Sequence, residues 1–106
     1  MNSIVFSDEA IKDLQGIKDY ISNELLNSVA ADNTVSKILR SIRILGDFPE
    51  SGSPLSSIIN YDSEYRFVVC GSYISFYTYE NETVYIHRIL YGKRNYLRIL
   101  FNNETE

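Results

Sequence analysis

The sequence predicts an α+β fold in which an antiparallel hairpin of two helices packs against a small antiparallel sheet. Apolar residues recur every three or four positions in the first half, which is the period of an amphipathic helix. In the second half the period changes to two, and the segments are rich in Val, Ile, Tyr and Phe, as in strands. The order of the segments is strand, helix, helix and three strands (βααβββ), a layered arrangement. With 106 residues, 44% of them hydrophobic and 23% charged, residues 1–106 are expected to form one domain.

The first half carries clear helix signals. The apolar segment 3–6 predicts a strand that ends at Ser7, a good helix N-cap, and two acidic residues follow where the helix dipole favours them. Asn27-Ser28 separates two apolar stripes, and Gly46 and Pro49 end the second. The stripes are Ala10, Leu14, Ile17, Ile21 and Leu25, and then Ala31, Val35, Ile38, Ile42 and Leu45. A short break between two such helices predicts a hairpin, with the polar face of the first helix, Asp13 included, in solvent.

The second half predicts a loop and a three-stranded meander. Residues 50–64 are rich in turn-forming residues and predict a loop with a short pairing segment at 55–59. The strands are expected at 65–70, 73–79 and 83–90, with turns at Gly71-Ser72 and residues 80–82. The segment 3–6 is expected to join this sheet as a further strand. Residues 94–101 predict either a short C-terminal helix or an ordered tail.

Several function classes are disfavoured by simple features. The longest apolar runs are far shorter than the ~18–20 residues that span a bilayer. The first residues lack the features of a secretory signal, so we expect a cytoplasmic protein. The single cysteine, Cys70, can form neither an internal disulfide nor a zinc site, and its apolar flanks favour a buried thiol over a nucleophile. No motif for a metal, a nucleotide cofactor or a Ser/His/Asp triad is present, so neither cofactor nor metal is expected.

The charge is unevenly distributed. The whole chain carries 10 basic and 14 acidic residues, net −4. Residues 83–103 contain no acidic residue but hold Arg88, Lys93, Arg94 and Arg98, which leaves six basic against 14 acidic residues elsewhere, net −8. These cations either serve only the solubility of the surface or form an anion-binding face. The anion could be an RNA phosphate, a DNA phosphate or a carboxylate of an acidic partner. Arg66 could add to it across the sheet.

Some side chains in the same region are candidates for chemistry or docking. Tyr91 and Tyr96 flank the Lys93-Arg94 pair, and a tyrosine beside cations can stack on a base or donate a proton. The only histidine, His87, is either a structural strand residue or an acid/base group. A last set of residues is expected to be exposed and to suit an amphipathic partner segment: Leu97, Leu100 and Phe101.

The ordered motifs resemble the RelE/ParE superfamily of bacterial toxins from type II toxin–antitoxin systems. They are DL-x2-I-x2-YI from Asp13, FP-x2-G from Phe48, YR at Tyr65-Arg66, and RIL-x-G-x-R from Arg88. No single motif is highly specific, but together they cover essentially the whole chain. The resemblance implies a helical hairpin on a small antiparallel sheet, in agreement with the prediction above. It also implies a cognate antitoxin that wraps the toxin and covers its functional face, in a hetero-oligomer.

The resemblance implies two alternative activities. RelE-like members cleave mRNA on the ribosome, and ParE-like members inhibit DNA gyrase without nuclease activity. Arg66 and Arg94 match phosphate-binding arginines of the nuclease members, Tyr96 matches a nearby functional tyrosine, and Tyr91 stands where many relatives have histidine. If the chain is a nuclease, Arg66, Arg94, Tyr91 and Tyr96 are therefore its expected catalytic residues. However, residues 50–64 contain no Lys or Arg, whereas the nucleases keep lysines there. Together with the net charge of −4, this favours gyrase inhibition over mRNA cleavage.

Overall fold

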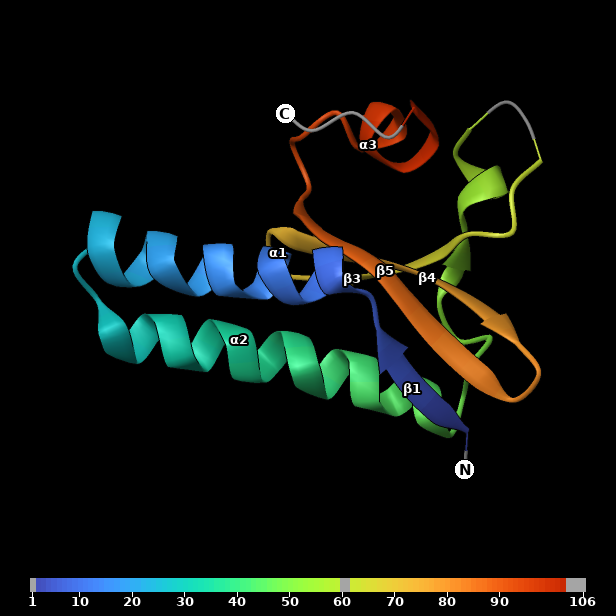
Figure 1. Cartoon of the computed structure of the whole chain (residues 1–106), viewed down its shortest axis with the longest axis horizontal. Helices are drawn as coiled ribbons and strands as arrows, with labels where there is room; N and C mark the ends of the chain where they lie inside the picture. The colour runs from blue at the N-terminus through green and yellow to red at the C-terminus, as the bar shows by residue number, and fades with distance from the viewer. Residues whose placement is uncertain (1, 60–61, 103–106) are drawn as a thin grey trace.

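A computed structural model describes residues 2–59 and 62–102 of the chain (Figure 1). It confirms the predicted fold class: an N-terminal strand, two helices, a sheet and a short C-terminal helix, with several short elements between them. The strands are β1 (Ser3–Phe6), β2 (Ser53–Pro54), β3 (Arg66–Cys70), β4 (Tyr73–Glu80) and β5 (Thr83–Tyr91). The α-helices are α1 (Asp8–Asp19), α2 (Ser28–Arg43) and α3 (Tyr96–Asn102). The other turns are the π-helix η1 (Tyr20–Glu24) and the 3-10 helices η2 (Ile44–Gly46) and η3 (Leu55–Ser57).

The five strands form one mixed sheet in the order β1-β5-β4-β3-β2. Strands β3, β4 and β5 pair antiparallel, as predicted, and β2 adds an antiparallel pair with β3. Strand β1 joins the sheet as expected but runs parallel to β5, with Ser3 opposite Thr83 and Phe6 opposite Ile86. Parallel pairing needs a long connection between the two strands, and here the hairpin and three strands lie between them in the sequence. The prediction of an antiparallel sheet was therefore wrong for this one pair of strands.

Each face of the sheet carries its own apolar core. The α1–α2 hairpin covers one face, where its buried residues meet Tyr77, Val84, Ile86 and Ile89 of the strands. On the other face, Leu55 of η3 and Ile99 and Leu100 of α3 pack on Phe76 and Leu90. Figure 1 shows the hairpin and α3 on opposite sides of β5. Adjacent residues of one strand therefore serve different cores, as expected for side chains that alternate between sheet faces.

The two long helices begin where the sequence predicts, but the predicted buried stripe of the first helix ends earlier than expected. Ser7 and Asn27 cap α1 and α2, since their side chains accept hydrogen bonds from the N–H groups of Ala10 (3.0 Å) and Ala30 (2.9 Å). The inclusion of Leu25 in the buried stripe was wrong, because 57% of Leu25 is exposed. The π-helical turn η1 lies just before it. A π turn rotates the following residues away from the spacing of three and four that places them on one face.

The loop after the hairpin is anchored by a buried tyrosine. The pairing segment predicted at 55–59 was wrong: Ser53–Pro54 pairs with β3, and Leu55 turns into the second core as part of η3. The hydroxyl of Tyr77, which is fully buried, accepts a hydrogen bond from the Gly52 N–H (3.0 Å) and donates one to the Pro49 carbonyl (2.8 Å). A Cβ on Gly52 would lie only 2.5 Å from this hydroxyl, so the close approach requires glycine.

Candidate functional site

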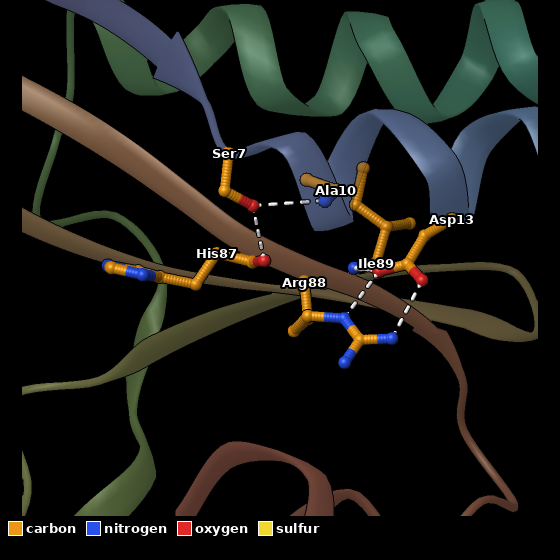
Figure 2. A network of polar contacts seen from close by, with 6 residues as sticks. All are labelled: Ser7, Ala10, Asp13, His87, Arg88 and Ile89. Carbon is orange, nitrogen blue, oxygen red and sulfur yellow. Dashed lines mark hydrogen bonds and ion pairs between the residues drawn. The ribbon is translucent and has the colours of Figure 1, made fainter. Parts of the chain in front are cut away.

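The cationic segment begins on β5, at a point where the strand loses its neighbour. Strand β1 pairs with β5 only as far as Ile86, so the next residues of β5 need other hydrogen-bond partners. The Ser7 hydroxyl donates to the His87 carbonyl (2.7 Å), and the Ile89 N–H donates to the Asp13 carboxylate (2.9 Å). Figure 2 shows both contacts reaching from the start of α1 to β5. The first turns of α1 thus continue the edge of the sheet where β1 stops.

Asp13 also holds Arg88. The Nε and Nη2 atoms of Arg88 donate to the two carboxylate oxygens of Asp13, at 2.8 and 2.9 Å (Figure 2). Only 18% of the Arg88 side chain and 11% of the Asp13 side chain are exposed. The hydrogen bond to Asp13 raises the pKa of Arg88 above its ordinary value, against the opposing effect of burial. The prediction that Asp13 lies in solvent was therefore wrong, and the charge of Arg88 is neutralised inside the protein.

Beyond Arg88, the chain borders a groove of about 680 Å³ between α1 and the ends of β4 and β5. Tyr91 and Arg94 line it from the cationic segment, and 41% of Tyr91 is exposed. The ring of Tyr91 meets that of Tyr73 edge to face, with centroids 5.9 Å apart. Burial raises the pKa of Tyr73, and the nearby phenols of Tyr20 and Tyr91 raise it further. These rings and Arg94 therefore form one surface.

The nuclease-type arginine Arg66 does not join this surface. Its Nε donates to the Gly52 carbonyl (3.2 Å) and its Nη2 to the Glu50 carbonyl (2.9 Å), so it anchors the loop. Arg66 lies opposite Tyr77 and Tyr91 lies opposite Tyr73. Those two positions of β4 are four residues apart, or about 13 Å along the strand at ~3.3 Å per residue. Arg66 and Tyr91 also lie on different strands, β3 and β5, with β4 between them.

The other candidate residues differ in their surroundings. The ring of Tyr96 packs on Phe76 at 5.1 Å in the second core, on the other side of the sheet from the hairpin. Lys93 and Arg98 are exposed at the surface. Leu97 is half-buried and Phe101 is 37% exposed. The expectation that Leu100 is exposed was wrong, because Leu100 turns into the second core with Ile99.

His87 occupies a bulge in β5. Arg88 lies opposite Phe76 and Ile86 opposite Tyr77, so His87 is the extra residue between them. Its Nε2 atom lies 2.8 Å from the Thr78 hydroxyl, and its ring meets Tyr65 edge to face at 5.3 Å. Burial lowers the pKa of His87, which favours the neutral imidazole. The small hollow beside it, about 380 Å³, has Glu64 and no cation among the residues that line it.

No group of three or more His, Cys, Asp or Glu residues among residues 2–59 and 62–102 is placed to hold a metal ion. Cys70 is half-buried and free, and it packs against the hairpin-side core. In the same part of the chain, no helix is long and apolar enough to cross a membrane.

A family model described as the ParE toxin of the type II toxin–antitoxin system parDE matches residues 4–96. This chain belongs to the ParE toxin family. Among curated proteins, none matches it. Two solved structures show the same fold. A chain of the chromosomal ParDE toxin–antitoxin system from P. aeruginosa has a TM-score of 0.71 and 19% identity, covering 86% of this chain and 96% of that one. The isolated E. coli RelE toxin has a TM-score of 0.58 and 10% identity, covering 98% of this chain and 100% of that one.

Proposed function

We propose that this ParE-family toxin arrests growth by inhibiting DNA gyrase, and that a tightly bound antitoxin neutralises it in the cytoplasm. The observation that carries the proposal is the dispersal of the nuclease-type residues. Arg66 is bound to the carbonyls of the loop, Tyr96 packs in the second core, and neither lies with Tyr91 and Arg94. A nuclease needs its acid, base and phosphate-binding groups within hydrogen-bond reach of one phosphate.

The charge distribution supports the same reading. Arg88 is neutralised by Asp13, and residues 50–64 offer no Lys or Arg. Docking on ribosomal RNA relies on many basic phosphate contacts, which a chain of net charge −4 with one cation internally paired supplies poorly. A protein target such as gyrase places no such demand on the surface.

The test measures supercoiling by purified gyrase in the presence of this chain. We expect supercoiling to fall and cleaved DNA to accumulate as the chain approaches stoichiometry with the enzyme. A matched preparation carrying the antitoxin should leave supercoiling unchanged. Normal supercoiling at a tenfold excess of folded chain would contradict the proposal.

The second candidate, a RelE-type mRNA endonuclease acting on the ribosome, has one observation in its favour. Tyr91, Arg94 and Lys12 line one open groove, where a cation could hold a phosphate beside a phenol that donates a proton. This activity predicts mRNA cleavage on translating ribosomes and its loss in Arg94→Ala. The matched control is Lys37→Ala, which removes an exposed cation from α2, on an element that does not line the groove.

A further inference from the structure

The outward face of α2 carries only basic and neutral polar side chains over most of its length. Between positions 33 and 43 the exposed residues recur with the period of the helix, and we call them the α2 stripe: Asn33, Ser36, Lys37, Arg40 and Arg43. The buried residues of this helix, Ala31, Ile38 and Ile42, pack in the hairpin-side core. Three of the ten basic residues of the chain therefore face solvent along one side of α2.

No carboxylate of the described residues pairs with these three cations. No acidic residue occurs from position 33 to position 46, and the two ion pairs of the described structure involve other residues. Arg40 lies three positions from both Lys37 and Arg43, so like charges repel each other along the helix. The helix dipole favours Arg40 and Arg43 in the last turn, but Lys37 lies further from that end. On a chain of net charge −4, this stripe is locally complementary to an anion outside the chain.

The composition of the α2 stripe favours phosphate over the carboxylates of a protein. Lys, Arg, Ser and Asn are side chains that contact DNA phosphates, and the stripe contains no other kind. Protein–protein interfaces are instead built around an apolar or aromatic core. The exposed large apolar residues Val29 and Ile44 lie at the two ends of the helix, outside the stripe. The stripe therefore offers charge and hydrogen-bond donors, but no apolar anchor for a protein partner.

We propose that the α2 stripe binds the phosphate backbone of duplex DNA. The proposal rests on the proposed function, because gyrase acts on duplex DNA and a toxin bound to gyrase lies close to that DNA. Lys37 and Arg43 are six positions apart, or about 9 Å at ~1.5 Å per residue, and one DNA strand carries a phosphate every ~3.4 Å along its axis. The stripe thus matches about three phosphates of one strand. Three such contacts bind weakly by themselves on an acidic chain, but they strengthen a complex that a protein contact already holds.

The experiment measures binding of the full chain to a labelled DNA duplex of about 20 base pairs by fluorescence anisotropy, without gyrase, over a range of salt concentrations. The logarithm of the association constant should fall with the logarithm of the salt concentration with a slope of about −2.7, since each phosphate contact contributes about −0.9. Between about 50 and 200 mM salt, the affinity should therefore fall roughly 40-fold.

Two charge reversals separate the α2 stripe from the overall charge of the chain. Arg40→Glu, at the centre of the stripe, should weaken binding about tenfold or more at ~50 mM salt and make the slope shallower by about 1. The matched control Lys93→Glu makes the same change in net charge at an exposed lysine outside α2, and it should change the affinity less than about twofold. Both positions are exposed, so both variants should keep the circular dichroism spectrum and urea midpoint of the unchanged chain.

Several outcomes would overturn the proposal: a slope near zero, equal losses of affinity in the two variants, or tighter binding of polyglutamate or of an RNA duplex of the same length. Gyrase is absent from this titration, so its result is independent of the supercoiling assay. Normal supercoiling refutes the proposed function, whereas unchanged DNA binding in Arg40→Glu refutes the role of the α2 stripe.

Discussion

Removing the Asp13 carboxylate should destabilise the fold far more than an ordinary surface substitution. Asp13→Ala removes three hydrogen bonds, two from the Arg88 guanidinium and one from the Ile89 N–H. It leaves a largely buried cation and a strand-edge N–H without these partners. Hydrogen bonds to charged groups contribute about 1.5–3 kcal/mol each but are not additive, so we expect a loss of about 2–4 kcal/mol.

The assay is urea unfolding followed by circular dichroism, with thermal unfolding beside it. At ~2.1 cal/mol/K per residue of unfolding entropy, this loss corresponds to a fall in Tm of about 9–18 °C for a chain of this length. The matched control is Asp32→Ala, which removes the other ion pair of the described residues. In that pair the Lys18 Nζ lies 3.8 Å from the Asp32 Oδ1, and the two side chains are 51% and 70% exposed. Such an exposed pair contributes at most ~1 kcal/mol.

A double-mutant cycle of Asp13→Ala with Arg88→Ala isolates the pair. The coupling free energy should be about 1–3 kcal/mol, because the two charges are in direct contact and shielded from water. If Asp13→Ala unfolds at the same urea concentration as Asp32→Ala, or if the coupling is zero, the argument that Asp13 completes the edge of β5 is refuted.

Two other substitutions test the remaining polar contacts. Tyr77→Phe should lower the free energy of unfolding by about 1–3 kcal/mol, because the Gly52 N–H and Pro49 carbonyl lose a buried partner. The exposed Tyr85→Phe is its control, and equal urea midpoints for the two variants would contradict the expectation. Burial lowers the pKa of His87, so the unfolded chain binds this proton more readily, and stability should fall as the pH drops below the unfolded pKa of about 6.5. Comparing urea midpoints at pH 7.5 and 5.5 should show a smaller loss in His87→Asn than in the wild type, and identical losses would remove His87 as the cause.

The large elements could be predicted because their signals are local. The Ser7 and Asn27 caps, the two apolar stripes and the change of period at the meander depend on neighbours within a few residues. Leu25 was misplaced because a π-helical turn breaks the spacing of three and four, and nothing in the pattern marks that turn. The parallel pairing of β1 with β5 depends on contacts between residues about 80 positions apart, which periodicity does not record.

The sequence predicts which residues belong to the candidate site, but not how they are arranged in space. Arg88, Tyr91 and Arg94 were singled out, yet only the fold shows that Arg88 is bound by Asp13 whereas Arg94 lines an open groove. Asp13 was assigned to solvent because it lies on the polar side of an amphipathic helix. A helix beside a strand edge can hide a carboxylate there, if strand N–H groups and a cation satisfy it.

The Asp13–Arg88 pair and the groove are connected through the path of β5. Asp13 binds the N–H of Ile89, two residues before Tyr91, and Tyr91 leads by the Gly92 turn to Arg94. The Gly92 N–H donates to the Ser72 carbonyl (2.8 Å), so this end of the strand is fixed from both sides. The first and last motifs of the chain, which begin at Asp13 and at Arg88, are in direct contact. Residues 75 positions apart in the sequence therefore fix this end of β5 together.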